Sequence, residues 1–239
     1  MTLSAKQAIE KSLLTLGAPH VVTTQDLNAY AEFETGARPS PATITRMANA
    51  LAKTGALQRV SRTVYLNKLA GPTIQLAEAA QYIRRGAVAS LAWVLERSGA
   101  LNNYGDVVTC VVPLVVGMAP PRVGEHQTLA GQFRFYGMPI RIMNCGAAQV
   151  EDVQDVRYAY PRATPERALM DWVYLGSSPH SRLPLPPLDI QLHGMSQPRL
   201  KRLSKAMGLE SEWVRWHSQW QKREATDDVR ENVSSGLGF

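Results

Sequence analysis

Polar and basic side chains are concentrated between Ser40 and Arg62, in a segment suited to contact a nucleic acid. Arg and Asn form paired hydrogen bonds with the edges of guanine and adenine, so Arg46 and Asn49 are candidates for reading DNA bases. No Asp or Glu occurs from 35 to 67, so the segment could approach phosphates without like-charge repulsion. A solvated helix of no further function would show the same residue types. Thr45 shares the face of Arg46 and Asn49, and the residues suited to contact phosphates are Ser40, Thr43, Lys53, Arg59 and Arg62.

The Ser40-Pro41 pair predicts the start of a helix that carries this polar face. Serine is a good N-cap, and proline is tolerated at the first helical position because its missing N–H would have no partner there. Gly55 suits the left-handed residue that follows a helix. Apolar residues recur at spacings of three and four and predict one buried side: Ile44, Met47, Ala48 and Leu51.

Two further helices and a pair of short strands are predicted around this helix. Ser4 with Gln7 forms a capping-box pattern for a helix that stops near Gly17, and Thr23 and Thr24 offer caps for one that ends near Gly36. Strands at 57–60 and 63–66 would flank a turn at Ser61-Arg62. Three helices followed by a hairpin is the order of a winged helix-turn-helix, although the link from 33 to 40 is longer than usual. We therefore expect a DNA-binding domain over residues 1–70.

The remainder of the chain predicts an α+β fold with a different order of helices and strands. Gly71-Pro72 is the candidate boundary, and residues 71–180 predict helices at 76–83, 90–95 and 164–176, a strand at 107–112 and a hairpin that turns at 136–139. Residues 181–239 follow as a proline-rich segment and a helical tail from 197 to about 223. The expected fold class is thus α+β: a winged helix-turn-helix, a mixed α+β domain and a C-terminal helical region.

Charge and composition limit the partners that we expect. The formal net charge is +6, and residues 1–70 hold eight Lys or Arg against four Asp or Glu. This basic excess suits a polyanion, although it could also serve solubility. No secretory signal is apparent, and the longest apolar stretch, at 107–121, is too short to span a bilayer. We expect a cytoplasmic protein without a membrane partner.

No group of residues predicts catalysis, a cofactor or a metal ion. The five histidines are scattered, Cys110 and Cys145 lack ligand spacing, and no nucleotide-binding or nucleophile motif occurs. We expect no enzyme activity. Glu166 and Asp171 could act as acid and base, but a carboxylate in the first turn of a helix is favoured by the helix dipole, which makes a structural role the better interpretation.

A cluster of cations and tryptophans near the C-terminus has two interpretations. It could bind nucleic acid or a protein partner, or its tryptophans, spaced by three and four, could form one buried stripe. Both interpretations stay open at this stage. The cluster comprises Arg199, Lys201, Arg202, Lys205, Trp213, Trp216 and Trp220.

Three segments together resemble the AbiEi antitoxin family. They are GAVASLAWVL at 86–95, SGAL at 98–101 and ATPERALMD at 163–171, and the similarity spans about residues 1–180. The family comprises transcriptional regulators of type IV toxin–antitoxin and abortive-infection systems, with an N-terminal winged helix and a C-terminal antitoxin domain. The segment after 179 has no match in that pattern.

The resemblance implies a repressor that binds its own promoter or operator. It also implies a functional partner, a nucleotidyltransferase-like toxin encoded beside it, which the region after Gly71 would neutralise without necessarily forming a stable complex. Two alternatives remain: a protein-interaction module whose winged helix binds a protein, and a ligand-responsive transcription factor with a pocket in residues 71–180.

Overall fold

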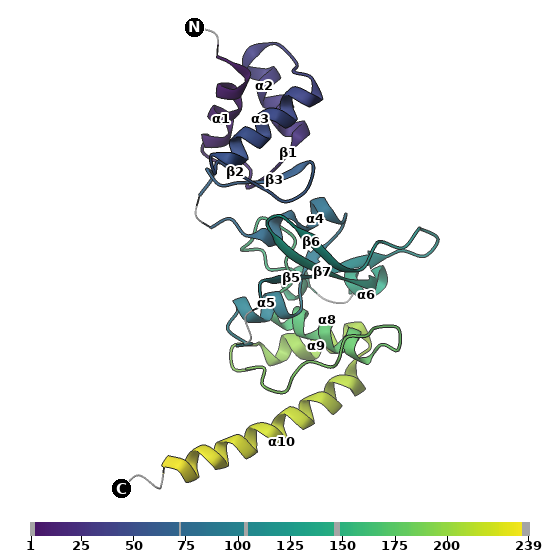
Figure 1. The fold of residues 1–239 in the computed structure, drawn as a ribbon. Coiled ribbons are helices and arrows are strands. Elements are labelled where there is room, and N and C mark those ends of the chain that lie inside the picture. The colour runs from purple at the N-terminus through teal and green to yellow at the C-terminus, as the bar shows by residue number, and fades with distance from the viewer. Residues whose placement is uncertain (1–2, 72, 103–104, 146–148, 236–239) are drawn as a thin grey trace. The chain divides into compact units, whose positions relative to one another are not determined.

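The structure is a computed structural model that describes residues 3–71, 73–102, 105–145 and 149–235, with side chains as far as 226. Its fold is mixed α+β and contains two sheets (Figure 1). The chain divides into two compact units, the first of which comprises Met1–Ala87, Asp106–Val108 and Gly124–Phe135. The boundary predicted at Gly71-Pro72 stays a prediction, and Pro72 itself lies outside the described residues.

Residues 3–67 fold into three helices and a small three-stranded sheet. Strand β3 lies in the centre of this sheet and pairs antiparallel with β1 on one side and β2 on the other. In chain order the elements are α1 Ala5–Leu14, β1 Val21–Thr23, α2 Thr24–Thr35, α3 Pro41–Lys53, β2 Leu57–Arg59 and β3 Val64–Asn67.

The predicted helix starts are confirmed by their capping hydrogen bonds. Ser4 and Gln7 form the capping box of α1, Thr23 forms one with Asp26 at α2, and the Ser40 hydroxyl accepts from the Thr43 N–H at α3. Helix α2 ends at the left-handed Gly36, as predicted. Helix α1 is shorter than predicted, because its C-cap is Thr15, two residues before Gly17.

The sequence interpretation missed strand β1, which occupies Val21–Thr23. Val21 pairs with Leu66 and Thr23 with Val64, so the strand exists through contacts with residues more than 40 positions away. Three residues are too short for a period of two to be visible in the sequence. Thr23, the last residue of β1, and Thr24 after it indicated only a helix start.

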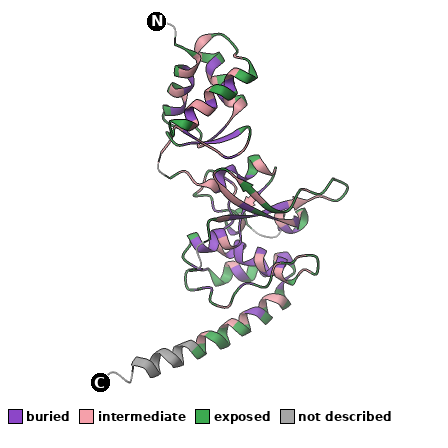
Figure 2. Cartoon of the chain, in the orientation of Figure 1, coloured by how far each residue is buried: buried purple, intermediate pink, exposed green. Residues whose placement is uncertain are grey.

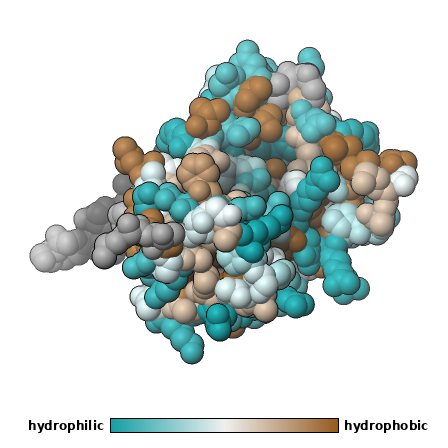
Figure 3. All heavy atoms as spheres, turned by 90° about the horizontal axis from the view of Figure 1, so that it is seen from above, coloured by the Kyte–Doolittle hydropathy of each residue, from teal (hydrophilic) through white to brown (hydrophobic). Residues whose placement is uncertain are grey.

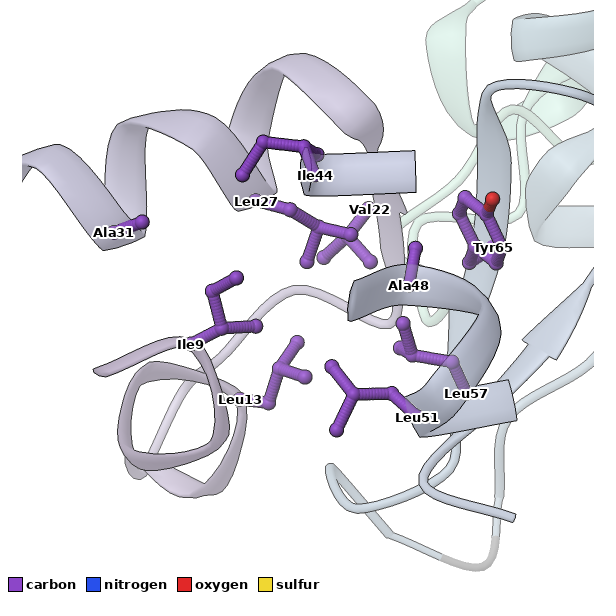
Figure 4. Close-up of a cluster of buried hydrophobic side chains, with 10 residues drawn as sticks. All are labelled: Ile9, Leu13, Val22, Leu27, Ala31, Ile44, Ala48, Leu51, Leu57 and Tyr65. Carbon is purple, nitrogen blue, oxygen red and sulfur yellow. The ribbon is translucent and has the colours of Figure 1, made fainter. Parts of the chain in front are cut away.

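A single apolar cluster holds these elements together (Figure 4). Helices α1, α2 and α3 direct Ile9, Leu27 and Leu51 into it, and each of the three is fully buried. Burial of each such side chain contributes about 1.5–3 kcal/mol, so the cluster fixes the rotation of every helix about its axis. The polar face of α3 is thereby held toward solvent, with exposed residues alternating with buried ones along the helix (Figure 2).

The second sheet corrects one prediction. Residues 136–139 do not turn: β7 runs without a break over Gly131–Pro139, and Ile140–Asn144 is a short helix, α6. The hairpin is formed instead by β6 and β7, with Thr128 paired to Gly131 and the Thr128 hydroxyl donating to the Gly131 carbonyl at 2.6 Å. Gly131 has φ +143°, which a turn can use, whereas Gly137 lies within the strand. The sheet contains β4 Val88–Ala89, β5 Val107–Leu114, β7 Gly131–Pro139 and β6 Gly124–Thr128, in that order.

Apart from α7, Val150–Val153, which the sequence analysis did not predict, the remaining helices match the predicted segments approximately. Residues 76–83 split into a 3₁₀ turn, η1, and one α-turn, α4, and the helix predicted at 90–95 begins at Ala92 after Leu91, whose φ is +58°. The predicted tail is two helices, because Gly208 is left-handed at φ +69° and ends the first of them. No helix in the described part of the chain is long and apolar enough to cross a membrane. The bounds are η1 Leu76–Ala79, α4 Ala80–Ile83, α5 Ala92–Arg97, α7 Val150–Val153, α8 Pro165–Ser177, α9 Gln197–Met207 and α10 Glu210–Ser235.

A buried carboxylate anchors α9 to α7. Asp152, 1% exposed, accepts hydrogen bonds from Arg199 Nε at 3.0 Å and from Arg202 Nε and Nη2 at 2.8 and 2.7 Å. The hydrogen bonds from Arg202, followed by those from Arg199, lower the pKa of Asp152. Two of the four cations of the C-terminal cluster are therefore engaged within the fold.

Acid should weaken this anchor, and the Asp152→Asn variant should lack this pH dependence because it has no carboxylate to protonate. A carboxylate whose pKa is lower in the folded state stabilises the fold above its unfolded pKa of about 3.9, and this stabilisation is lost as the pH falls through the folded value. The advantage of the wild type over Asp152→Asn in free energy of unfolding should be complete at about pH 6 and shrink below about pH 4. Urea titrations across this range measure it, and a difference that does not change with pH contradicts the assignment.

Candidate nucleic-acid interface

An open groove of about 790 Å³ lies between the polar face of α3 and the turn of the β2–β3 hairpin. Along α3, Thr45, Arg46 and Asn49 line it, and the hairpin contributes Arg62. Five of the eight predicted DNA contacts therefore meet at one surface, while Ser40, Thr43 and Arg59 lie outside its lining. The complete lining is Pro41, Ala42, Thr45, Arg46, Asn49, Ala50, Lys53 and Arg62.

The register of α3 decides which side chains reach this groove. Ile44, Ala48 and Leu51 are at most 1% exposed, so the helix cannot rotate without exposing apolar surface. Arg46 and Lys53 are exposed as a consequence, and Asn49 is half-buried. Because Arg46 and Asn49 are separated by three residues, they lie next to each other on the helix surface.

Arg62 is presented by a tight turn in the hairpin. The N–H groups of Val60 and Ser61 both donate to the Val64 carbonyl, at 2.9 and 3.1 Å. Arg59, which had been assigned to phosphate contact, donates from Nε to the Ser61 carbonyl at 3.1 Å and is half-buried. This hydrogen bond makes Arg59 a brace for the turn that exposes Arg62.

The hydroxyl groups near the start of α3 have partners within the helix. Ser40 Oγ and Thr43 Oγ1 are 3.0 Å apart, and Ser40 Oγ also accepts from the Thr43 N–H at 3.2 Å. Thr45 Oγ1 donates to the Pro41 carbonyl at 2.9 Å. Thr45 uses its hydroxyl proton within the helix, and the contact between Ser40 and Thr43 uses the proton of one of those two hydroxyls, so one of the three protons stays available. These hydroxyls are therefore weaker candidates as donors to phosphate than the three cations of the groove.

The groove is uniformly basic. Arg46, Lys53 and Arg62 form no ion pair with any residue that the structure describes. The acidic residues at the end of α2 are paired elsewhere, Glu34 with Lys11 and Glu32 with Arg38. A polyanion that enters the groove would thus meet cations without displacing an internal partner.

Ala42 and Ala50 were missed by the sequence interpretation, although both line the groove. They lie on the same helical face as Arg46 and Asn49, which was the available signal. Small side chains allow a close approach of the helix backbone, and an alanine methyl can contact the methyl group of thymine.

The acidic candidates of the second unit are engaged in the fold. Glu166 accepts from the Ser196 N–H at 2.9 Å and from Arg199 Nη1 at 3.4 Å, and Asp171 accepts from Arg167 Nε at 2.6 Å. Both carboxylates are at most 4% exposed. Within the part of the chain that the structure describes, no three His, Cys, Asp or Glu side chains come together as metal ligands.

The tryptophans of the C-terminal cluster form an aromatic run on α10, as the buried-stripe interpretation predicted in part. Trp216 is 1% exposed and stacks on Trp213 at 5.5 Å, whereas Trp213 and Trp220 are half-buried. Beyond Trp220, α10 is mostly exposed as far as its side chains are described (Figure 2).

A scan against protein-family models and a search of curated proteins both find no match for this chain.

Proposed function

We propose that residues 1–70 form a winged helix-turn-helix domain that binds double-stranded DNA. The observation that carries this proposal is the groove in which Arg46 and Lys53 of α3 face Arg62 of the hairpin, with no described ion partner for any of them. The element order and the pairing of β2 with β3 are compatible with such a domain. In this arrangement α3 enters the major groove and the hairpin follows the backbone.

Each residue of the groove has a role under this proposal. Arg46 and Asn49 contact base edges, for which their side chains supply paired hydrogen-bonding groups. Lys53 and Arg62 neutralise phosphates on either side of the recognition helix. Arg59 acts through Arg62, since it holds the turn of the hairpin.

We further propose that the protein represses its own promoter and opposes a nucleotidyltransferase-like toxin. This role is supported by the resemblance of residues 86–95, 98–101 and 163–171 to AbiEi antitoxins. Most polar side chains of the second segment serve the fold: Thr164 caps α8, Glu166 receives the Ser196 N–H, and Arg167 pairs with Asp171. The shared segment thus explains a common architecture, and the antitoxin surface would lie outside it.

DNA binding is tested by a gel-shift titration on the DNA upstream of the protein's own reading frame. We expect specific binding whose logarithmic affinity falls with the logarithm of salt concentration, by about 0.9 for each phosphate neutralised. The matched control is the Lys53→Glu/Arg62→Glu variant, which keeps the buried face of α3 and should lose binding. Equal affinity of both proteins for this DNA would exclude the groove as the contact surface.

The antitoxin role is tested separately, by co-expression. If a nucleotidyltransferase-like reading frame lies beside the gene, its toxicity should be suppressed by the full chain. The Lys53→Glu/Arg62→Glu variant expressed from an unrelated promoter should suppress it equally, because the second unit is unchanged. Survival that does not respond to co-expression excludes the antitoxin role and leaves DNA binding standing.

A protein-interaction module is the second candidate, and exposed apolar side chains favour it. Leu16 and Phe33, in the same unit as the groove, are 101% and 87% exposed. Apolar residues lie among polar ones over the face that Figure 3 shows. If the domain binds a protein through these side chains, Phe33→Ser should abolish binding to that partner, whereas the loss of Lys53 and Arg62 should not.

A further inference from the structure

The proline-rich segment 181–190 is held by indole groups of two helices. Trp172 of α8 donates its Nε1–H to the Pro184 carbonyl at 2.9 Å. Trp216 and Trp220 of α10 donate to the carbonyls of Pro186 and Ile190, both at 2.8 Å. Three tryptophans, spread over almost 50 residues of sequence, therefore contact one short segment through the same chemical group.

Gly176 provides the space that lets this segment lie against α8. A Cβ atom at Gly176 would come within 2.7 Å of Leu185 Cα and 2.8 Å of the Pro184 carbonyl oxygen. Both of these atoms belong to the backbone and cannot move aside as a flexible side chain could. The glycine thus serves close contact with the segment, one turn after Trp172 on the same helix face.

The segment itself has the properties of an extended proline-rich ligand. Residues 181–187 form neither helix nor strand, and three of the seven are proline, which sets φ near −65°. Pro186 is buried, while Pro184 and Pro187 are exposed. Proline-rich peptides are recognised elsewhere by grooves lined with aromatic rings, because their low conformational entropy and free carbonyl groups favour such contacts.

We propose that Trp172, Gly176, Trp216 and Trp220 form a recognition site for extended leucine- and proline-rich peptides, and that the chain's own segment 181–190 occupies it in cis. We call these four residues the indole platform. The partner is a protein that carries an LPLPP-like stretch, with carbonyl groups two residues apart for Trp172 and Trp216. Because the internal segment is tethered, its effective concentration at the platform is on the order of millimolar, and it competes with any partner segment. A partner segment therefore binds when the internal one is released.

The test measures binding of a fluorescein-labelled peptide with the sequence of residues 181–191 to the full chain. Pro186→Asp should release the internal segment, because it would place a carboxylate in a buried position, while the platform keeps all its residues. By fluorescence anisotropy, this variant should bind the peptide about tenfold or more tightly than the wild type does. Faster tryptic cleavage after Arg182 reports the release independently.

Gly176→Ala is the matched control. It should also release the segment and speed cleavage after Arg182, but it should leave peptide binding weak because the added methyl group blocks the groove itself. Pro186→Asp/Trp216→Phe keeps an aromatic ring without the N–H donor, and should bind about 2- to 10-fold more weakly than Pro186→Asp. A purely structural role for the segment predicts no peptide binding by any of these variants.

Several outcomes overturn the proposal. One is equal binding of the peptide by the Pro186→Asp and Gly176→Ala variants, and another is no peptide binding by a folded Pro186→Asp chain. The third is a wild-type dimer that the peptide dissociates, because the platform would then bind a second copy of the chain. If Pro186→Asp fails to fold, the wild-type chain is labelled with ¹⁵N and ¹³C and titrated with millimolar unlabelled peptide. Isotope-filtered NMR should then show cross-peaks from peptide protons to the indole N–H groups of Trp172, Trp216 and Trp220 and none to that of Trp93; the absence of these cross-peaks rejects the site.

Discussion

Replacement of Asp171 by alanine is expected to lower the free energy of unfolding by about 3–5 kcal/mol. Asp171 and Arg167 are 1% and 3% exposed and form an ion pair of 2.6 Å within α8. Without the carboxylate, the Arg167 guanidinium stays buried with its charge uncompensated, which is the costly way to break such a pair. Urea denaturation of the wild type and the variant at neutral pH measures the difference.

The neighbours of the pair sharpen this expectation. Ser90 donates to Asp171 Oδ2 at 2.7 Å, and Arg167 Nη2 donates to the Ile142 carbonyl at 3.0 Å. Arg167 Nη1 donates to Cys145 Sγ at 3.0 Å, and burial raises the pKa of that thiol, which stays neutral beside the cation. In the variant, Ser90 and Arg167 therefore both lose their acceptor, and Arg167 keeps only uncharged partners.

A double variant, Arg167→Met/Asp171→Ala, provides the control. Methionine is apolar and close to arginine in volume, so no charge is left buried, and the double variant should be more stable than Asp171→Ala. Two results would contradict the argument: a loss below about 1 kcal/mol for Asp171→Ala, or a double variant that is the less stable of the two.

Replacement of Arg46 by alanine should weaken binding to the specific DNA site by about 1–3 kcal/mol, which corresponds to a loss of about 5- to 150-fold in affinity. Arg46 is exposed, lines the groove and has no described ion partner, so its truncation should leave the fold unchanged. Affinity for unrelated DNA should fall less, because a base contact contributes only where its base is present. Gel-shift titrations on both DNAs give the ratio.

Lys53→Ala separates base reading from phosphate contact on the same helix. It should reduce affinity for all sequences by a similar factor and lower the slope of log affinity against log salt by about one. The two variants thus differ in specificity and in salt dependence, although each removes one positive charge. If Arg46→Ala reduces binding to specific and unrelated DNA equally, Arg46 contacts phosphate and the proposed base contact is wrong.

Much of the N-terminal architecture could be predicted because its signals are local. The cap at Ser40, the proline after it and the apolar spacing of Ile44 and Leu51 lie within one helix, and the structure confirms the start and the buried face that they indicate. The same holds for Thr164 and Pro165 at the start of α8. Such patterns depend on hydrogen bonds and periodicities between residues at most a few positions apart.

The features that sequence reasoning missed depend on contacts between distant residues. Strand β1 exists only through its pairing with β3, and the end of β7 was mistaken for a turn because alternation continues past Pro139 while the ladder does not. An aromatic stripe on α10 was one of two interpretations of the cluster, but neither included its hydrogen bonds to the proline-rich segment. The type of a residue and its spacing from its neighbours do not indicate which distant backbone group it will contact.

The sequence by itself determined which residues could contact DNA, since residue type and helical period decide which side chains share a face. Only the tertiary structure decided that Arg62 meets that face across a groove, that Arg59 braces the turn instead, and that Gly176 admits the backbone of the proline-rich segment. The physical reason is that local propensity acts over one or two turns of chain. Grooves and close backbone contacts arise from the packing of elements that the sequence separates, and such packing leaves no local pattern.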